Sequence, residues 1–363
     1  MKGGCIDKYF MYLSYKFCMY YSNSYYRKDL EEIVKNALPF EKLEGKNILV
    51  TGANGLIAST LVDTLAYLHE EKGINLNIYA LCRNKKKAEI RFESLLNKNF
   101  FYLIIQDVVE DYNMRINFHY IIHAASSAHP EAFRKDPVGI VNTNVIGIGK
   151  LLEYAKINGN EKFLFISSSE VYGENLHINE YFEDDYGSLE TMSFRSCYPE
   201  SKRMAETLGM SYLEQYGINF ISVRPAYIYG VSMNTDNNRV NEQFLRSACN
   251  NENIIMKSEG KQIRSYCYVS DCISALLFIM LLGKKGEAYN ISNRRQNISI
   301  REFAEIIAEI TGIKVIFEIP KSMDSYNIKN TILNSSKLES LGWMPKKSLK
   351  QSIENIVNIF RSL

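Results

Sequence analysis

Residues 47–58 read NILVTGANGLIA, and this stretch decides the fold. An apolar, β-branched run ends at Thr51, a glycine turn follows, and an apolar helix pattern then begins. Gly52 permits a tight turn, and Gly55 lets the backbone approach a pyrophosphate, which the N–H groups at the start of the helix attract. Ala58 is small enough for close packing of helix on strand. The stretch therefore predicts a dinucleotide-binding turn, with expected cofactor contacts from Gly52, Asn54, Gly55, Leu56 and Ile57.

Short apolar runs alternate with helical patterns through the first two thirds of the chain. Such runs are typical of buried parallel strands joined by crossover helices. The pattern predicts an α/β fold built on a doubly wound parallel Rossmann sheet. The expected strands are residues 47–51, 76–82, 101–106, 120–124, 163–168 and 220–224.

After Gly230 the pattern changes to short segments at 244–250, 254–257 and 287–291, which predicts a smaller mixed α/β C-terminal lobe. Its clearest helix is expected to begin after Ser299, which forms a capping box with Glu302, and to end at Gly312. We expect three parts. They are an N-terminal extension over 1–45, helical or partly disordered, a Rossmann cofactor-binding domain over 46–230, and a mostly substrate-binding lobe over 231–363, interleaved with the core.

Composition excludes several classes of protein. Apolar residues make up 46% and charged residues 23% of the chain, as in ordinary globular proteins. The net charge of +2, without a basic run, argues against nucleic-acid binding. Seven scattered cysteines predict reduced thiols in the cytoplasm, and neither they nor the five histidines form a metal-binding pattern.

The first 26 residues are rich in tyrosine and methionine, but Asp7, Lys8 and Lys16 interrupt them. No stretch of about 18 apolar residues exists there, so no membrane span and no secretory signal are expected. The alternatives for this segment are a helix on a membrane surface, packing against the protein body, partial disorder, or a later start of translation.

The end of the second expected strand bears on the choice of nicotinamide cofactor. An NAD site of this type usually carries a carboxylate there, which accepts hydrogen bonds from the ribose. In this chain Cys82 is followed by Arg83, Asn84 and three lysines. Because a guanidinium pairs well with a 2′-phosphate, Arg83 favours NADP(H). The alternative is that Arg83 stacks on adenine or lies in solvent.

Residues 198–202 read YPESK and predict the catalytic centre. Pro199 suits a first helical position, so Tyr198 and Lys202 should lie on one face of a new helix. A tyrosine titrates near pH 10, so its use as a base near neutrality requires roughly 4 kcal/mol in favour of the phenolate. An ammonium group and an oxidised nicotinamide ring both supply positive potential. The alternative is a surface tyrosine and lysine on an ordinary helix.

Residues 168–173 read SSEVYG and follow the strand expected over 163–168. Side chains at the carboxyl end of a parallel strand face the ligand crevice. We expect Ser168 to hydrogen-bond the substrate oxygen that exchanges its proton. Glu170 is either a second acid/base or a plain turn carboxylate.

Together, the glycine turn, Ser168 and the Tyr198/Lys202 pair resemble the extended short-chain dehydrogenase/reductases, particularly the nucleotide-sugar epimerases, dehydratases and decarboxylases. The resemblance covers about residues 46–358. It implies cofactor contacts from Asp107, Val108, Ala124, Ala125 and Asn144, and substrate contacts from Ser169, Tyr227 and Arg264, the arginine gripping the nucleotide diphosphate.

Residues 168–173 and 125–130 look most like the UDP-glucuronate decarboxylase branch of that family. This branch oxidises the sugar C4 hydroxyl, loses carbon dioxide from the resulting β-keto acid, and returns the hydride to C4. Two residues depart from the pattern. Arg83 is atypical for enzymes that hold NAD through a whole cycle, and Tyr227 stands where relatives commonly have an asparagine.

The resemblance implies an enzyme that modifies a nucleotide-diphosphate sugar by transient hydride transfer, with NAD(P) as cofactor and C4 as the reacting carbon. An NADPH-dependent reductase of a nucleotide-linked keto sugar is the alternative, which Arg83 favours, whereas the resemblance favours NAD. A third alternative is a non-catalytic nucleotide-binding sensor. The family also implies a homodimer through two helices that flank the sheet.

Overall fold

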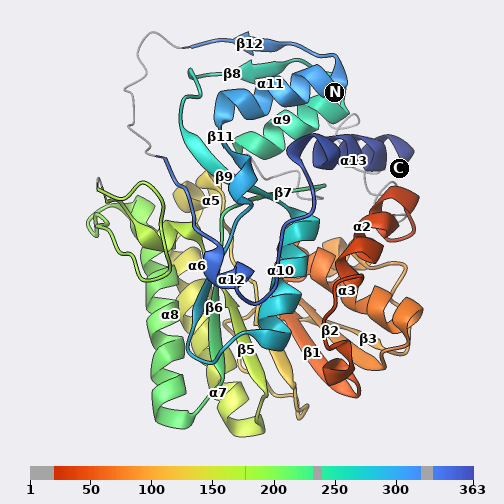
Figure 1. Cartoon of the computed structure of the whole chain (residues 1–363). Helices are drawn as coiled ribbons and strands as arrows, with labels where there is room; N and C mark the ends of the chain where they lie inside the picture. The colour runs from red at the N-terminus through yellow and green to blue at the C-terminus, as the bar shows by residue number, and fades with distance from the viewer. Residues whose placement is uncertain (1–19, 176, 232–238, 320–329) are drawn as a thin grey trace, which may run out of the picture.

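The computed structural model describes residues 20–175, 177–231, 239–319 and 330–363. A seven-stranded sheet, in the order β10-β6-β5-β4-β1-β2-β3, forms its body, with a smaller lobe above it in Figure 1. All neighbouring strands pair in parallel, as expected for a Rossmann sheet. The strands are β1 (Lys46–Thr51), β2 (Leu76–Cys82), β3 (Phe101–Ile105), β4 (Tyr120–His123), β5 (Lys162–Ile166), β6 (Phe220–Pro225) and β10 (Ala288–Ile291).

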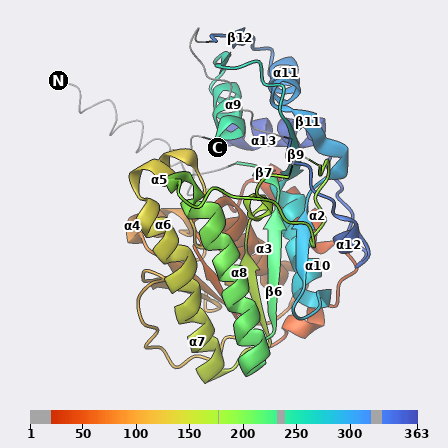
Figure 2. The same cartoon turned by 90° about the vertical axis from the view of Figure 1, so that its left-hand side faces the viewer.

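Helices cover both faces of the sheet, and the side chains of each strand alternate between the two faces. In β1, Ile48 and Val50 pack in one core cluster with α3 (Leu56–Lys72) and α10 (Val269–Leu282). Leu49 packs in a second cluster with α7 (Ile148–Asn158) and α8 (Cys197–Tyr216). Figure 2 shows α7 and α8 side by side on this second face. The shorter helices of the body are α4 (Lys85–Arg91), α5 (Pro130–Lys135) and α6 (Pro137–Val141).

Helix α2 (Ser24–Val34) packs on α3 and α10 in the body and on α13 (Leu349–Ser362) in the lobe (Figure 1). Asn23 caps it by accepting hydrogen bonds from two backbone N–H groups. A brace cluster of Tyr26, Asp63 and Arg91 lies beneath it: the Tyr26 hydroxyl donates to Asp63 at 2.7 Å, and Arg91 forms a buried ion pair with the same carboxylate. The first 19 residues of the tyrosine-rich segment lie outside the described residues.

The smaller lobe contains two short sheets and several helices. One sheet has the order β11-β9-β7 and the other pairs β12 with β8. These strands are β7 (Tyr227–Tyr229), β8 (Ile254–Met256), β9 (Ile263–Tyr268), β11 (Asn297–Ser299) and β12 (Val315–Phe317). The helices of the lobe are α9 (Val240–Cys249), α11 (Ile300–Thr311) and α13, whereas the short α12 (Ser336–Glu339) packs on β10 and α10 of the body. Helix α11 has the expected capping box of Ser299 and Glu302 and ends before Gly312.

The structure confirms the predicted fold class, and the six expected strands correspond to β1 through β6. Two expectations need correction. Residues 287–291 were expected in the lobe, but β10 pairs with β6 and forms an edge of the main sheet, a long-range pairing without a local signal. Pro199 occupies the third position of α8 rather than the first, since the helix begins at Cys197. The described part contains no helix long and apolar enough to cross a membrane.

Candidate active site

The glycine turn after β1 brings the chain backbone very close to the end of β4. Gly52 has φ +62°, and a Cβ built on it would lie 2.6 Å from the Ala125 Cα. Only glycine tolerates both constraints. The Gly55 N–H donates to the Gly52 carbonyl at 2.9 Å, and α3 then begins at Leu56 with its first N–H groups directed out of the turn. The buried Asn54 Oδ1 has no hydrogen-bond partner among the described residues. This cradle fits a pyrophosphate.

A cavity of about 220 Å³ lies at the carboxyl ends of the strands, beside this turn. Its lining brings together the start of α3, the segment after β4, the end of β5 and the first turns of α8. Seven of the residues that the sequence predicts for the site line this cavity: Gly55, Leu56, Ile57, Ala124, Ser168, Tyr198 and Lys202. Three members of the predicted catalytic set, Ser168, Tyr198 and Lys202, therefore share one cavity with the start of α3, whereas the fourth, Glu170, does not line it.

Tyr198 and Lys202 lie one helical turn apart on α8, as the spacing predicts. The Lys202 Nζ donates to the Ile166 carbonyl at 2.8 Å and lies 5.8 Å from the centre of the Tyr198 ring. Phe133 stacks on Tyr198, with ring centres 5.1 Å apart, and fixes the orientation of the phenol. Both side chains are buried, and both line the cavity.

The pKa values of the pair differ from the expectation that Lys202 lowers the pKa of the tyrosine. Burial, with a contribution from Glu170, raises the pKa of Tyr198 to about 12, against a lowering effect of the Ser168 hydroxyl. Burial also lowers the pKa of Lys202 to about 7. The physical reason is that desolvation outweighs the nearby charges of the chain. The residues of the chain alone therefore do not favour the phenolate.

Ser168, Ser169 and Glu170 form the tight turn after β5. The Ser168 Oγ accepts a hydrogen bond from the Glu170 N–H at 3.1 Å while it lines the cavity. Ser169 is buried in this turn. The Glu170 carboxylate pairs with Arg195 at 3.0 Å and lies close enough to Tyr198 to affect its pKa. Arg195 in turn lies over the Phe133 ring, which stacks on Tyr198, so the half-exposed Glu170–Arg195 pair lies beside the phenol.

The residues expected at the adenine end lie around the ends of β2 and β3. Arg83 Nη1 approaches Asp107 Oδ2 at 3.6 Å, and the Arg83 side chain is 72% exposed. Val108 is buried against Gly147, where an added Cβ would lie 2.8 Å from its Cγ2. The Ala125 N–H donates to Thr51 Oγ1 at 3.4 Å, which joins β4 to the glycine turn.

Asn144 lies behind the catalytic helix. It belongs to a π-helical turn over Asn142–Gly147, a feature frequent at functional sites. Its Nδ2 donates to the Ser201 Oγ at 2.8 Å, and that hydroxyl donates to the Tyr198 carbonyl at 3.0 Å. Asn144 thus anchors the first turn of α8. Its Oδ1 has no hydrogen-bond partner among the described residues.

Tyr227 and Arg264 lie together but apart from this cavity lining. They come from β7 and β9, neighbouring strands of the lobe, and the guanidinium lies 5.2 Å from the centre of the Tyr227 ring. Arg264 is only 4% exposed. The resemblance alone assigns these two residues to the substrate.

Several polar residues of the cavity were not singled out from the sequence. Glu242 and Arg239 come from the start of α9, and burial raises the pKa of Glu242 to about 7. No sequence motif marks these two residues, because a long-range contact brings α9 to the cavity. Ser126, Ser127 and His129 also line the cavity and lie after β4, within residues 125–130, whose sequence resembles the decarboxylase branch of the family. Within the described residues, no group of three or more His, Cys, Asp or Glu side chains is arranged to hold a metal ion.

Comparisons with known proteins agree with this geometry. UDP-glucuronic acid decarboxylase 6 of Arabidopsis thaliana is 33% identical over 318 residues, which cover 86% of this chain and 88% of that protein. UDP-glucuronic acid decarboxylase 1 of Xenopus tropicalis is 29% identical and covers 87% of this chain and 72% of that protein. Both are similar to this chain over most of its length.

Solved structures show the same fold. A UDP-glucose 4-epimerase from Thermotoga maritima, solved with UDP-glucose, is 25% identical with a TM-score of 0.74, covering 87% of this chain and 99% of that one. A UDP-glucuronic acid 4-epimerase from Bacillus cereus, in complex with UDP-glucuronic acid and NAD, is 22% identical with a TM-score of 0.72 and shows the fold alone, over 87% and 99% of the two chains.

The family itself is identified by a family model that matches residues 48–292, two thirds of the chain. That match confirms the resemblance read from the glycine turn and the YPESK motif, and with it a nicotinamide cofactor. The chain belongs to the NAD-dependent epimerase/dehydratase family.

Proposed function

We propose that this chain catalyses a redox-neutral change on a nucleoside-diphosphate sugar that begins with oxidation at C4, and that UDP-glucuronic acid is its substrate. One observation carries the proposal: Tyr198, Ser168 and Lys202 line one cavity together with the start of helix α3. The choice of substrate is supported by the relatives named UDP-glucuronic acid decarboxylase, which match this chain over most of its length.

The chain offers a fitting site for a dinucleotide. The Gly52 cradle and the first N–H groups of α3 would hold the pyrophosphate. Asp107 and Val108 would contact the adenosine, and Lys202 would hold the nicotinamide ribose. A bound nicotinamide supplies a hydride acceptor and, in its oxidised form, the positive charge that favours the Tyr198 phenolate.

In this proposal Tyr198 removes the proton of the C4 hydroxyl and later returns it. Ser168 orients the substrate oxygen, and the Lys202 ammonium would add its positive charge to that of the oxidised nicotinamide, so that together they favour the ionised phenol. Oxidation at C4 makes a uronic acid a β-keto acid, which loses carbon dioxide readily. Glu170, held by Arg195 beside Tyr198, would take up a proton from water and pass it to the carbon left behind, C5.

The choice between NAD and NADP rests on Arg83. A guanidinium favours NADP, but Arg83 faces the Asp107 carboxylate at 3.6 Å and is largely exposed, which weakens its attraction for a 2′-phosphate. We propose that NAD is the cofactor and is recycled in each turnover. The NADPH-dependent reductase is the second candidate, because Arg83 occupies the position where NAD sites usually carry a carboxylate.

We also propose a homodimer formed through α7 and α8, the two helices seen side by side in Figure 2. Their surfaces carry exposed apolar side chains, including Ile157, Met204, Met210 and Tyr216. Light scattering of the eluting protein tests the dimer.

The five described cysteines are free thiols, which supports a cytoplasmic location.

Incubation with UDP-glucuronic acid tests the proposed activity. We expect release of carbon dioxide and a new UDP-pentose, with absorbance at 340 nm unchanged once the reaction is complete. Stoichiometric consumption of NADPH with a nucleotide-linked keto sugar, without activity on UDP-glucuronic acid, would establish the reductase instead.

A further inference from the structure

A buried polar cluster lies directly behind the catalytic lysine. Glu206 follows Lys202 by four residues on α8, so the two side chains lie on the same face of the helix. Arg224 of β6 holds the carboxylate with two hydrogen bonds, Nη2 to Oε2 at 2.7 Å and Nε to Oε1 at 3.0 Å. The Ser222 hydroxyl donates to the same Oε1 at 2.7 Å. The mechanism proposed above uses none of these three residues.

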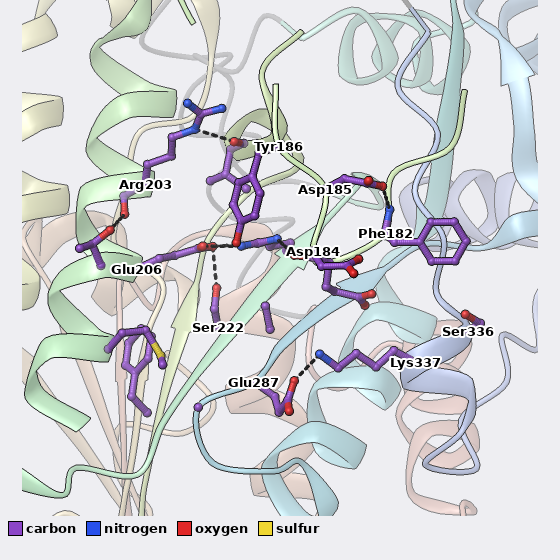
Figure 3. Close-up of a pocket in the computed structure, with 18 residues that line it drawn as sticks. Phe182, Asp184, Asp185, Tyr186, Arg203, Glu206, Ser222, Glu287, Ser336 and Lys337 are labelled. Atoms are coloured by element: carbon purple, nitrogen blue, oxygen red, sulfur yellow. Dashed lines mark hydrogen bonds and ion pairs between the residues drawn. The ribbon is translucent and has the colours of Figure 1, made fainter. Parts of the chain in front are cut away.

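The carboxylate is fixed in place because Arg224 is itself fully engaged. Arg224 Nη1 donates to the Tyr172 hydroxyl at 3.1 Å and to the Glu183 carbonyl at 2.7 Å. Figure 3 shows Glu206 at the wall of a second cavity of about 800 Å³, with its side chain directed toward Ser222. Burial raises the pKa of Glu206, but Arg224 and the hydroxyl donors outweigh it and hold this pKa below its ordinary value. Glu206 therefore carries a negative charge at neutral pH.

A nearby negative charge favours the protonated form of the buried Lys202 side chain. Its ammonium is fully buried and donates a hydrogen bond to the neutral Ile166 carbonyl at 2.8 Å. The titratable groups that face it are Tyr198, Glu206 and His123 of β4. Burial lowers the pKa of His123 to about 3, so the imidazole is neutral. The Glu206 carboxylate opposes the effect of burial on Lys202 by raising the pKa of the lysine.

We propose that Glu206 is a positioning residue for the reaction: its buried carboxylate, one helical turn beyond Lys202 and clamped by Arg224 and Ser222, favours the charged form of Lys202 beside the cavity. The inference rests on the proposed role of Lys202 at the active site. It adds a third member to the helical series Tyr198, Lys202 and Glu206, each four residues after the last. The Arg224 partner acts on the carboxylate and not directly on the lysine.

The pKa of Lys202, measured directly, tests this role without substrate. The protein is labelled with ¹³C at lysine Cε, whose chemical shift follows protonation, and the Lys202 signal is the one missing from Lys202→Met. In Glu206→Gln we expect the pKa of Lys202 to fall from about 7 to below about 6, because the neighbouring negative charge is lost. The alkaline limb of the kcat/KM profile should move to lower pH by the same interval.

Two controls separate this effect from a structural one. Glu214→Gln removes an exposed carboxylate from the same helix and should leave the pKa of Lys202 unchanged. Arg224→Lys disturbs the clamp but retains its positive charge and the Glu206 carboxylate, so this pKa should stay near the wild-type value. If Glu206→Gln does not fold, the double variant Glu206→Gln/Arg224→Gln leaves no unpaired buried charge, and it should still lower the pKa.

The outcomes are distinct. An unchanged pKa of Lys202 in folded Glu206→Gln, or equal shifts in Glu206→Gln and Arg224→Lys, overturns the inference even if the enzyme is active. Absence of turnover in the wild-type protein refutes the proposed function instead, and the lysine titration still reports on Glu206.

Discussion

Two buried pairs of a carboxylate and a guanidinium lie on opposite faces of the sheet. Asp63 and Arg91 form one beneath helix α2, and Glu206 and Arg224 form the other beneath α8. Both are almost inaccessible to solvent, yet their neighbours differ. The first pair is covered by the tyrosines Tyr20 and Tyr26, whereas the second lies one helical turn from Lys202. Beneath α2, the buried pair therefore contributes to packing alone. Beneath α8, it contributes to packing and also to the charge of Lys202 at the cavity.

The largest expected effect comes from breaking the pair beneath α2. Asp63→Asn leaves the buried Arg91 charge without its partner, which should lower the free energy of unfolding by about 3–5 kcal/mol. Urea unfolding measures this change. Glu71→Gln on the same helix breaks an exposed pair with Arg27 and should cost less than about 1 kcal/mol. Lost turnover in a fully stable Asp63→Asn protein would contradict a purely structural role.

Next in size is the change at the catalytic tyrosine. Tyr198→Phe should reduce kcat by at least about two orders of magnitude, or about 3 kcal/mol in the barrier, since it removes only the acid/base. Quenching of fluorescence by bound cofactor should report wild-type affinity. Tyr212→Phe is the matched control, because Tyr212 lies on the far part of α8, where its hydroxyl donates to Glu153 of α7, and it does not line the cavity. Near-normal turnover in Tyr198→Phe would exclude the assigned role.

A pH prediction follows from the lysine. The folded pKa of Lys202 is about 7, below the ordinary 10.5, so between these values the unfolded chain binds a proton that the folded chain lacks. Lys202 therefore adds stability as pH rises through this window, by about 1.4 kcal/mol for each pH unit. Urea unfolding of wild type and Lys202→Met at pH 7, 8 and 9 should show the difference in slope. Parallel slopes would indicate an ordinary lysine.

The smallest effect belongs to a third, exposed pair, Arg83 and Asp107. Because an exposed ion pair contributes roughly 0–1 kcal/mol, Arg83→Ala should alter NAD⁺ affinity less than about threefold and leave NAD⁺ preferred over NADP⁺. Titration calorimetry with both cofactors measures this. A large, selective loss of NADP⁺ binding would show that Arg83 serves a 2′-phosphate.

Local patterns predicted the body of the molecule well. The alternation of apolar runs predicted β1 to β6, and the spacing of Gly52, Gly55 and Tyr198/Lys202 predicted residues that line or support one cavity. Long-range contacts were beyond such patterns. They bring β10 to the main sheet and Glu242 of α9 to the cavity. The spacing of Glu206 from Lys202 is visible in the sequence, but the ionised state of Glu206 depends on its ion pair with Arg224, which lies on another element.

The most direct measurement of the central claim follows the hydrogen on C4. UDP-glucuronic acid carrying deuterium at C4 is turned over in ordinary water, and the product is read by NMR and mass spectrometry. If the hydrogen on C4 is removed and returned in the same cavity, the labelled substrate should turn over more slowly than the unlabelled one. The product should keep deuterium at C4, and absorbance at 340 nm should show no net change. Product formed without an isotope effect, or with ordinary hydrogen at C4, would contradict the account.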